Sequence, residues 1–184
     1  MCAGTPLTYG ATYTFVSTGP IKVYLCYCTA CHAAIRPYTR DQIIATSRRN
    51  ASDVNCQFRI AAMPAAGLAT AKTATSAAAS FGLQLASGTK YMSLCRGCPW
   101  PASVAVANAS SVSGSAVWRA DVVYAGRWGN PQIKLQDLNG KYLGLCPNST
   151  CSGATKNYTL WMAADSAGAL TWMAMLVQSA REFW

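Results

Sequence analysis

Hydrophobic and polar residues alternate one by one along much of this chain, in short runs that end at Gly, Asn or Ser residues. The first clear run is Thr12 to Ser17, and similar runs recur as far as 170-LTWMAMLV-177. Alternation with β-branched and aromatic residues predicts strands with one buried face. Helical periodicity, with apolar residues every three to four positions, is nearly absent. The pattern therefore predicts an all-β fold.

Three segments of the chain resemble one another. Each contains a strand-like apolar run, a Gly turn, a Lys, a Leu-Cys pair and a second cysteine within five residues. Each is followed by another alternating run with a large residue at its centre. The segments are 15-FVSTGPIKVYLCYCTAC-31, 83-LQLASGTKYMSLCRGC-98 and 135-LQDLNGKYLGLCPNSTC-151, and the runs that follow are 55-NCQFRIAAM-63, 116-AVWRADVVYA-125 and 158-YTLWMAAD-165.

Three copies of about four short strands predict a β-trefoil, in which strands from all copies close one barrel and hairpins cap it. We predict a single domain over residues 1–184, with repeats at about 8–63, 81–126 and 132–177. A β-sandwich built from the same strands is the alternative.

The third copy contains 132-QIKLQDLNGKYLGL-145. This stretch resembles the strand, N-G-K-Y-L turn and strand that recur in fascin-like and agglutinin-type β-trefoils. The resemblance implies the trefoil fold, which hosts lectins, growth factors, protease inhibitors and actin bundlers.

Nine cysteines in a chain of this size favour disulfides formed in an oxidising compartment. The repeats predict a local pair in each copy. Cys28 is then an extra residue whose predicted partner is Cys56, and Cys2 is left to bridge to another chain or to displace one of these pairs. The predicted local pairs are Cys26–Cys31, Cys95–Cys98 and Cys146–Cys151.

Four of the seven asparagines stand in N-x-[ST] sequences, at Asn50, Asn108, Asn148 and Asn157. Coincidence in a Ser/Thr-rich chain is one explanation, and a secreted eukaryotic glycoprotein is the favoured one. The first residues, MCAGTPLTYG, lack the charged and apolar regions of a signal peptide, so the numbering suggests a mature chain or one with an added Met1. No apolar run is long enough to span a membrane.

The stretch Cys28-Thr29-Ala30-Cys31-His32 spells C-x-x-C-H, the attachment pattern of c-type haem. The alternatives are a haem, a metal site, or a loop histidine beside a disulfide, and the repeated cysteines favour the last. We therefore expect no metal and no cofactor. The six acidic residues form no evident acid/base pair, and 94-LCRGCPW-100 lacks the βαβ context of a redox C-x-x-C. The chain is thus predicted not to be an enzyme.

The net charge is +9, and four basic residues gather in one insertion at Arg36, Arg40, Arg48 and Arg49. They belong to a solvated loop, or they bind the sulfate or carboxylate groups of an acidic polysaccharide. Nucleic acid is the poorer partner for a secreted chain.

Tryptophans at 118, 161 and 172 fall at predicted core positions. Trp100 and Trp128 instead lie between Pro and Gly residues, in turns where an indole ring can stack on a sugar. With the polar turn residues Asp137 and Asn139, they are the predicted carbohydrate-binding residues.

The Ala/Thr/Ser-rich segment 61–80 is predicted to be a long surface loop or a docking arm. Two functions follow from these patterns. The favoured one is a secreted, non-catalytic module that binds carbohydrate or polyanion. The alternative is a structural subunit of an extracellular matrix or filament, assembled through Cys2 and the 61–80 segment.

Overall fold

The structure is a computed structural model that describes residues 7–20, 22–28, 41–63, 80–95, 105–124, 130–145, 157–163 and 169–177. These residues contain twelve strands and two single turns of 3-10 helix, η1 (Val54–Cys56) and η2 (Gly114–Ala116). The strands are β1 (Thr12–Ser17), β2 (Tyr24–Cys28), β3 (Gln42–Thr46), β4 (Gln57–Ala62), β5 (Ser80–Leu85), β6 (Tyr91–Leu94), β7 (Ala105–Ala109), β8 (Trp118–Tyr124), β9 (Gln132–Gln136), β10 (Tyr142–Leu145), β11 (Asn157–Ala163) and β12 (Trp172–Leu176).

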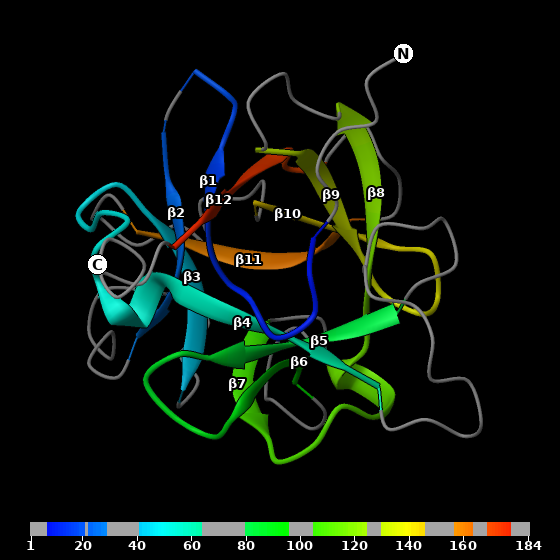
Figure 1. The fold of residues 1–184 in the computed structure, drawn as a ribbon. Helices are drawn as coiled ribbons and strands as arrows, with labels where there is room; N and C mark the ends of the chain where they lie inside the picture. The colour runs from blue at the N-terminus through cyan, green and yellow to red at the C-terminus, as the bar shows by residue number, and fades with distance from the viewer. Residues whose placement is uncertain are drawn as a thin grey trace.

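Six strands close a ring of antiparallel pairs, in the order β1, β4, β5, β8, β9, β12 and back to β1 (Figure 1). The other six form the hairpins β2/β3, β6/β7 and β10/β11. The hairpins meet one another because β3 also pairs with β7 and β11. A closed ring capped by three hairpins is a β-trefoil. The predicted fold class is confirmed, and the β-sandwich alternative is wrong because the sheet closes.

The barrel core repeats three times around the ring. Equivalent cross-strand pairs join Tyr13 to Phe58, Phe81 to Trp118, and Ile133 to Trp172. All six side chains are buried in one cluster. They face inward because side chains alternate between the two faces of a strand, as the sequence pattern predicts.

The strand pairs also fix the register of the repeats. Tyr24 of β2 pairs with β1, Tyr91 of β6 with β5, and Tyr142 of β10 with β9, so these three tyrosines are equivalent. Counting forward from them, Cys28, Cys95 and Cys146 occupy the same position. The predicted alignment used Cys26 in place of Cys28 and is wrong by two residues. A shift of two keeps every side chain on its face, so alternation alone does not detect it.

This register changes the disulfide scheme. Cys26 bonds to Cys56, with the two Cα atoms 4.0 Å apart, and the bond ties β2 to the turn η1. The predicted pairs Cys26–Cys31 and Cys28–Cys56 are therefore wrong. Both sulfurs lie in a buried cluster with Cys28 and Ile44, on the face of the hairpin away from the barrel core. Cys28 and Cys95 are disulfide-bonded as well. Four further cysteines of the prediction, Cys31, Cys98, Cys146 and Cys151, lie outside the described residues, as do Cys2 and His32.

Candidate functional site

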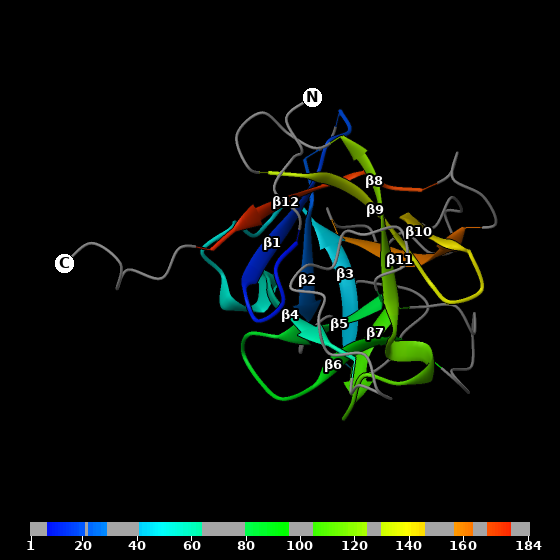
Figure 2. The same cartoon turned by 45° about the vertical axis from the view of Figure 1, so that its right-hand side comes forward.

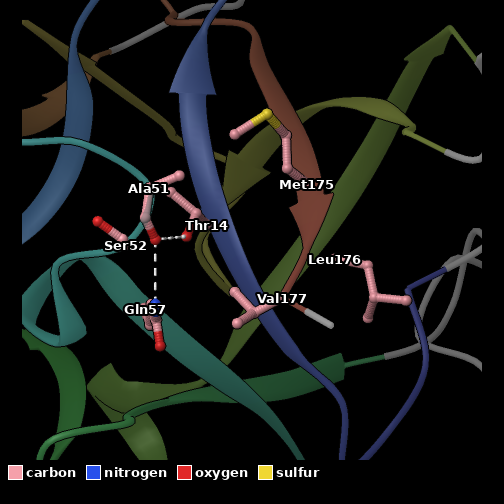
Figure 3. Close-up of a pocket in the computed structure, with 7 residues that line it drawn as sticks. All are labelled: Thr14, Ala51, Ser52, Gln57, Met175, Leu176 and Val177. Carbon is pink, nitrogen blue, oxygen red and sulfur yellow. Dashed lines mark hydrogen bonds between the residues drawn. The ribbon is translucent and has the colours of Figure 1, made fainter. Parts of the chain in front are cut away.

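A groove of about 360 Å³ lies on the outer surface of the barrel, where the first and last strands of the ring meet. One wall is β1 with the loop that joins β3 to β4, and the other is the end of β12 (Figure 3). Figure 3 shows polar side chains on the first wall and Met175 and Val177 on the second, with the Leu176 side chain turned to the other side of β1. The lining residues are Thr14, Ala51, Ser52, Gln57, Met175, Leu176 and Val177.

Strand alternation places the groove's floor. Tyr13 and Phe15 point into the core, so Thr14 between them faces outward. Thr14 pairs across the sheet with Gln57 on one side and with Met175 on the other. The groove thus combines residues from the two ends of the chain.

Two hydrogen bonds hold the loop against this floor. The Thr14 hydroxyl donates to the carbonyl oxygen of Ala51 at 3.2 Å, and Gln57 Nε2 donates to the same oxygen at 3.0 Å. Figure 3 shows both bonds converging on Ala51. The Gln57 side-chain oxygen is turned away from Ala51, and no donor from the described residues reaches it. This oxygen can accept a hydrogen bond from a ligand.

The loop itself is internally ordered. Asn50 Oδ1 accepts from Ser52 N at 3.0 Å and from Ser52 Oγ at 2.6 Å. Asp53 Oδ1 caps η1 by accepting from Asn55 N at 2.9 Å. Cys56 then anchors the end of the loop through its disulfide. A rim fixed in this way is preorganised, which lowers the entropy lost on binding.

The equivalent position in the second repeat is filled. Phe81 and Tyr13 occupy equivalent inward-facing positions in the two repeats. Gly82 follows Phe81 and Thr14 follows Tyr13, so Gly82 corresponds to Thr14. A Cβ atom on Gly82 would overlap the side chain of Val112, which is buried there beside Tyr91. In the third repeat the charged residues Lys134 and Asp121 face each other across the corresponding strands. The three repeats thus differ at this position: Thr14 lines the groove, Gly82 is covered by Val112, and Lys134 stands opposite Asp121.

Gly82→Ala is expected to lower the free energy of unfolding by about 1–3 kcal/mol, because the new methyl group displaces Val112 from a filled position. Gly88→Ala is the matched control, since no atom lies within 4 Å of a Cβ built there. Urea unfolding of the two variants checks the prediction. Equal stabilities would show that Val112 does not pack as tightly on Gly82 as the structure has it.

The predicted residues Asp137 and Asn139 lie in the turn between β9 and β10. Asp137 is only 5% exposed, and its Oδ1 accepts from the backbone nitrogens of Asn139 and Lys141, each at 2.9 Å. Gly140 completes the turn with a φ of +79°, which suits glycine. The geometry supports a turn-forming role for Asp137. Ligand binding by these two residues stays a prediction.

Two of the predicted arginines flank the groove loop. Arg49 forms an ion pair with Asp53 at 3.1 Å, and Arg48 is exposed beside it. Arg36, Arg40, Trp100 and Trp128 lie outside the described residues. Thr14, Gln57 and Met175 were not predicted as site residues, and no motif could have found them, because only closure of the ring brings them together.

Among the predicted glycosylation sites, Asn50 and Asn108 have exposed side chains. Asn157 begins β11 and pairs with Thr46. Asn148 lies outside the described residues. Whether any of these asparagines carries a glycan stays a prediction.

A polar cluster joins the first two repeats. Tyr27 donates its hydroxyl to Asp41 Oδ1 at 2.6 Å, and Lys90 Nζ lies 2.9 Å from Asp41 Oδ2. The carbonyl oxygen of Asp41 accepts from Ala107 N at 2.7 Å. These contacts hold Asp41 at a φ of 60°, a conformation that Asp adopts more readily than most residues. The cluster connects β2 and β7, so we assign it a structural role.

Burial, followed by the hydrogen bond to Asp41 and the charge of that carboxylate, raises the pKa of Tyr27 from 10.0 to about 12. The folded protein therefore holds this proton more tightly than the unfolded chain does. Its stabilising contribution is complete below pH 10 and is lost as the pH rises toward about 12. Phenolate absorbance is titrated in the parent and in Tyr27→Phe. The variant should lack the absorbance change of one tyrosine that ionises near pH 12 in the parent. A missing tyrosine near pH 10 would contradict the Asp41 contact.

No group of three or more His, Cys, Asp or Glu side chains lies close enough to hold a metal ion within the described part of the chain. In that same part, no helix has the length and apolar character required to cross a membrane.

No family model matches the sequence, and no curated protein matches it. The fold is nevertheless similar to several solved structures. A Caenorhabditis elegans protein of unknown function is 13% identical, with a TM-score of 0.65 over 95% of this chain and 98% of that one. An SDF2-like protein from Arabidopsis thaliana is 15% identical, with a TM-score of 0.65 over 92% and 94% of the two chains.

A third similar structure is the Macrolepiota procera ricin B-like lectin in complex with lactose. It is 16% identical, with a TM-score of 0.53 over 93% of this chain and 99% of that one. Identities this low show a shared fold and carry no function with them. The three structures match nearly the whole of this chain, in agreement with the trefoil topology of its strands.

Proposed function

We propose that this protein is a non-catalytic carbohydrate-binding module whose ligand occupies the groove between β1 and β12. The observation that carries the proposal is the pairing of a polar wall with an apolar wall in one preordered site. A sugar ring has the same character, with hydroxyl groups at its edge and a C–H face. Lactose in the similarly folded Macrolepiota procera lectin supports the class of ligand by analogy.

Each wall has a defined part in binding. The apolar wall of Met175 and Val177 covers the C–H face of a sugar and excludes water from it. Gln57 accepts a hydrogen bond from a sugar hydroxyl through its side-chain oxygen. The exposed Arg48 near the rim places a positive charge beside the groove, which favours sugars with carboxylate or sulfate groups. The net charge of +9 on the whole chain also attracts such anionic sugars.

A secreted glycoprotein is the setting that fits this module. The buried Cys26–Cys56 disulfide requires an oxidising environment to form. We propose no haem, because Cys28 is in a disulfide and such a sulfur has no thiol with which to form a thioether. Three of the four acidic residues in the described chain, Asp137, Asp53 and Asp41, stand in turn, cap and ion-pair roles. The fourth, Asp121, accepts a hydrogen bond from the Tyr142 hydroxyl, and this set supports a module without catalysis.

Met175→Asp is expected to weaken binding on the order of tenfold, because Met175 pairs with Thr14 on the groove face and the substitution replaces apolar surface with a carboxylate. A glycan array first identifies a ligand, and titration calorimetry then compares the variants. Leu138→Asp is the control, because Leu138 is 44% exposed and lies in the β9–β10 turn, outside the groove lining. Binding that is weakened equally by both substitutions, or by Leu138→Asp alone, would place the site elsewhere.

A structural subunit of an extracellular matrix or filament is the second candidate. The observation in its favour is the end of β8, where Val122, Val123 and Tyr124 are all exposed. Figure 2 shows this strand running to the edge of the fold. Size-exclusion chromatography with and without reductant separates the two candidates. A stable oligomer without affinity for any glycan would favour assembly.

A further inference from the structure

One glycosylation sequence stands directly at the rim of the groove. Asn50, Ala51 and Ser52 form an N-x-S sequence, and Ala51 and Ser52 both line the groove. The Asn50 side chain is exposed. We propose that an N-linked glycan on Asn50 covers the groove and lowers its affinity for saccharides, so that occupancy of this site regulates binding.

The loop already holds the sequence in a form compatible with the modification. Asn50 Oδ1 accepts hydrogen bonds from Ser52 N at 3.0 Å and from Ser52 Oγ at 2.6 Å. Glycosylation joins C1 of an N-acetylglucosamine to Nδ2. The donor is a lipid-linked oligosaccharide diphosphate, whose lipid diphosphate leaves from C1 as Nδ2 loses one proton. The amide oxygen is unchanged, so the turn between Asn50 and Ser52 persists in the glycosylated protein.

The glycan is consequently attached to a rigid base. The Ala51 carbonyl oxygen accepts from Thr14 and Gln57, and the disulfide at Cys56 fixes the far end of the loop. A sugar on Nδ2 of Asn50 therefore begins one residue from the rim and cannot move away with the loop. Across the groove from the neighbouring Ala51 and Ser52 lie Met175 and Val177, the residues proposed to receive a sugar's C–H face.

The chain contains a matched control sequence at Asn108. Its side chain is also exposed, and its Oδ1 also accepts a hydroxyl, from Ser93 Oγ at 2.6 Å. Asn108 lies in β7 of the second repeat and does not line the groove. A glycan there leaves the groove open. The two sites therefore differ in their position relative to the groove, and each presents an exposed asparagine whose Oδ1 accepts a hydrogen bond from a serine hydroxyl.

The test uses the protein secreted from a eukaryotic host, with site occupancy measured by mass spectrometry. Peroxide oxidation of Met175 reports on the groove directly, and Met173 on the same strand, outside the groove lining, is the internal control. In the protein glycosylated at Asn50, Met175 is expected to oxidise several-fold more slowly than after enzymatic glycan removal, while Met173 is unchanged. Met175 should oxidise at the fast rate of the deglycosylated protein in the Asn50→Gln variant, and at the slow rate of the glycosylated protein in the Asn108→Gln variant.

Two results would overturn the inference. One is a protein that carries a glycan on Asn108 and none on Asn50, and the other is a Met175 oxidation rate that is the same with and without the Asn50 glycan. The regulatory part rests on the proposed function, and a second readout separates the two. Removal of the Asn50 glycan is expected to raise saccharide affinity on the order of tenfold. If no glycoform binds any saccharide but the Asn50 glycan protects Met175 from oxidation, the proposed function is wrong and the inference that the glycan covers the groove is confirmed. If all glycoforms bind equally, the regulation fails alone.

Discussion

Replacing both Cys26 and Cys56 with alanine is expected to lower the free energy of unfolding by about 3–4 kcal/mol, the range for a crosslink closing a loop of intermediate length. The bonded residues are 30 apart in the sequence, so the bond removes many conformations from the unfolded chain. Both sulfurs are fully buried, and their loss also leaves a small cavity. Denaturant unfolding of the double variant and the parent measures the difference.

A short local crosslink supplies the control. By the register of the repeats, Cys95 is equivalent to Cys28, and its predicted partner is Cys98. A loop this short constrains the unfolded chain less, so the Cys95→Ala, Cys98→Ala variant should lose less than about 3 kcal/mol. The scheme would be contradicted if both double variants lost the same stability. Peptide mapping without reduction shows in each case which pairs are present.

Trp118→Phe is expected to cost about 2–4 kcal/mol, because it combines a core cavity with a buried carbonyl left without a donor. Trp118 Nε1 donates to the carbonyl oxygen of Met92 at 3.0 Å, and the whole side chain is buried. The substitution removes that donor while Met92 stays in the core. Thermal or denaturant unfolding of the variant tests the cost.

The equivalent tryptophan of the third repeat should behave differently. Trp172 is equally buried, but its Nε1 has no acceptor in the described structure. Leu143, which is equivalent to Met92, already accepts from Leu170 N at 3.0 Å. Trp172→Phe therefore removes an unpaired donor, which offsets part of the cavity cost. It should be less destabilising than Trp118→Phe by about 1 kcal/mol or more. The reverse order would mean that Trp172 has a bound water or another partner.

Alternation along the chain was sufficient to predict an all-β fold, and the three similar segments predicted the trefoil barrel. Runs such as Thr12–Ser17 became ring strands with their apolar side chains inside, and the internal similarity predicted three groups of strands. The register within the first copy was missed because Leu25-Cys26 and Tyr27-Cys28 both end in cysteine and differ by two positions. A strand presents the same face at either register, and only pairing with β1 decides between them.

The groove could not be predicted for a different reason. Thr14, Gln57 and Met175 are unremarkable in sequence, and they become neighbours only when β12 pairs with β1 across the whole chain. Asp137 shows a different limitation. The sequence placed it in an N-G turn as a ligand-binding residue, and the structure adds a turn-forming role for its carboxylate, while ligand binding by it stays a prediction. Polar residues in tight turns often satisfy the backbone before they meet a ligand.

The most direct test of the binding groove is a nitrogen-15 NMR titration of protein without N-glycans, using a saccharide selected on the array. We expect the largest shifts at the amides of Thr14, Ser52, Gln57 and Leu176, which border the groove, and no change at Asp137 to Lys141 in the β9–β10 turn. Shifts confined to that turn or to other parts of the chain, with the groove amides unmoved, would contradict the account.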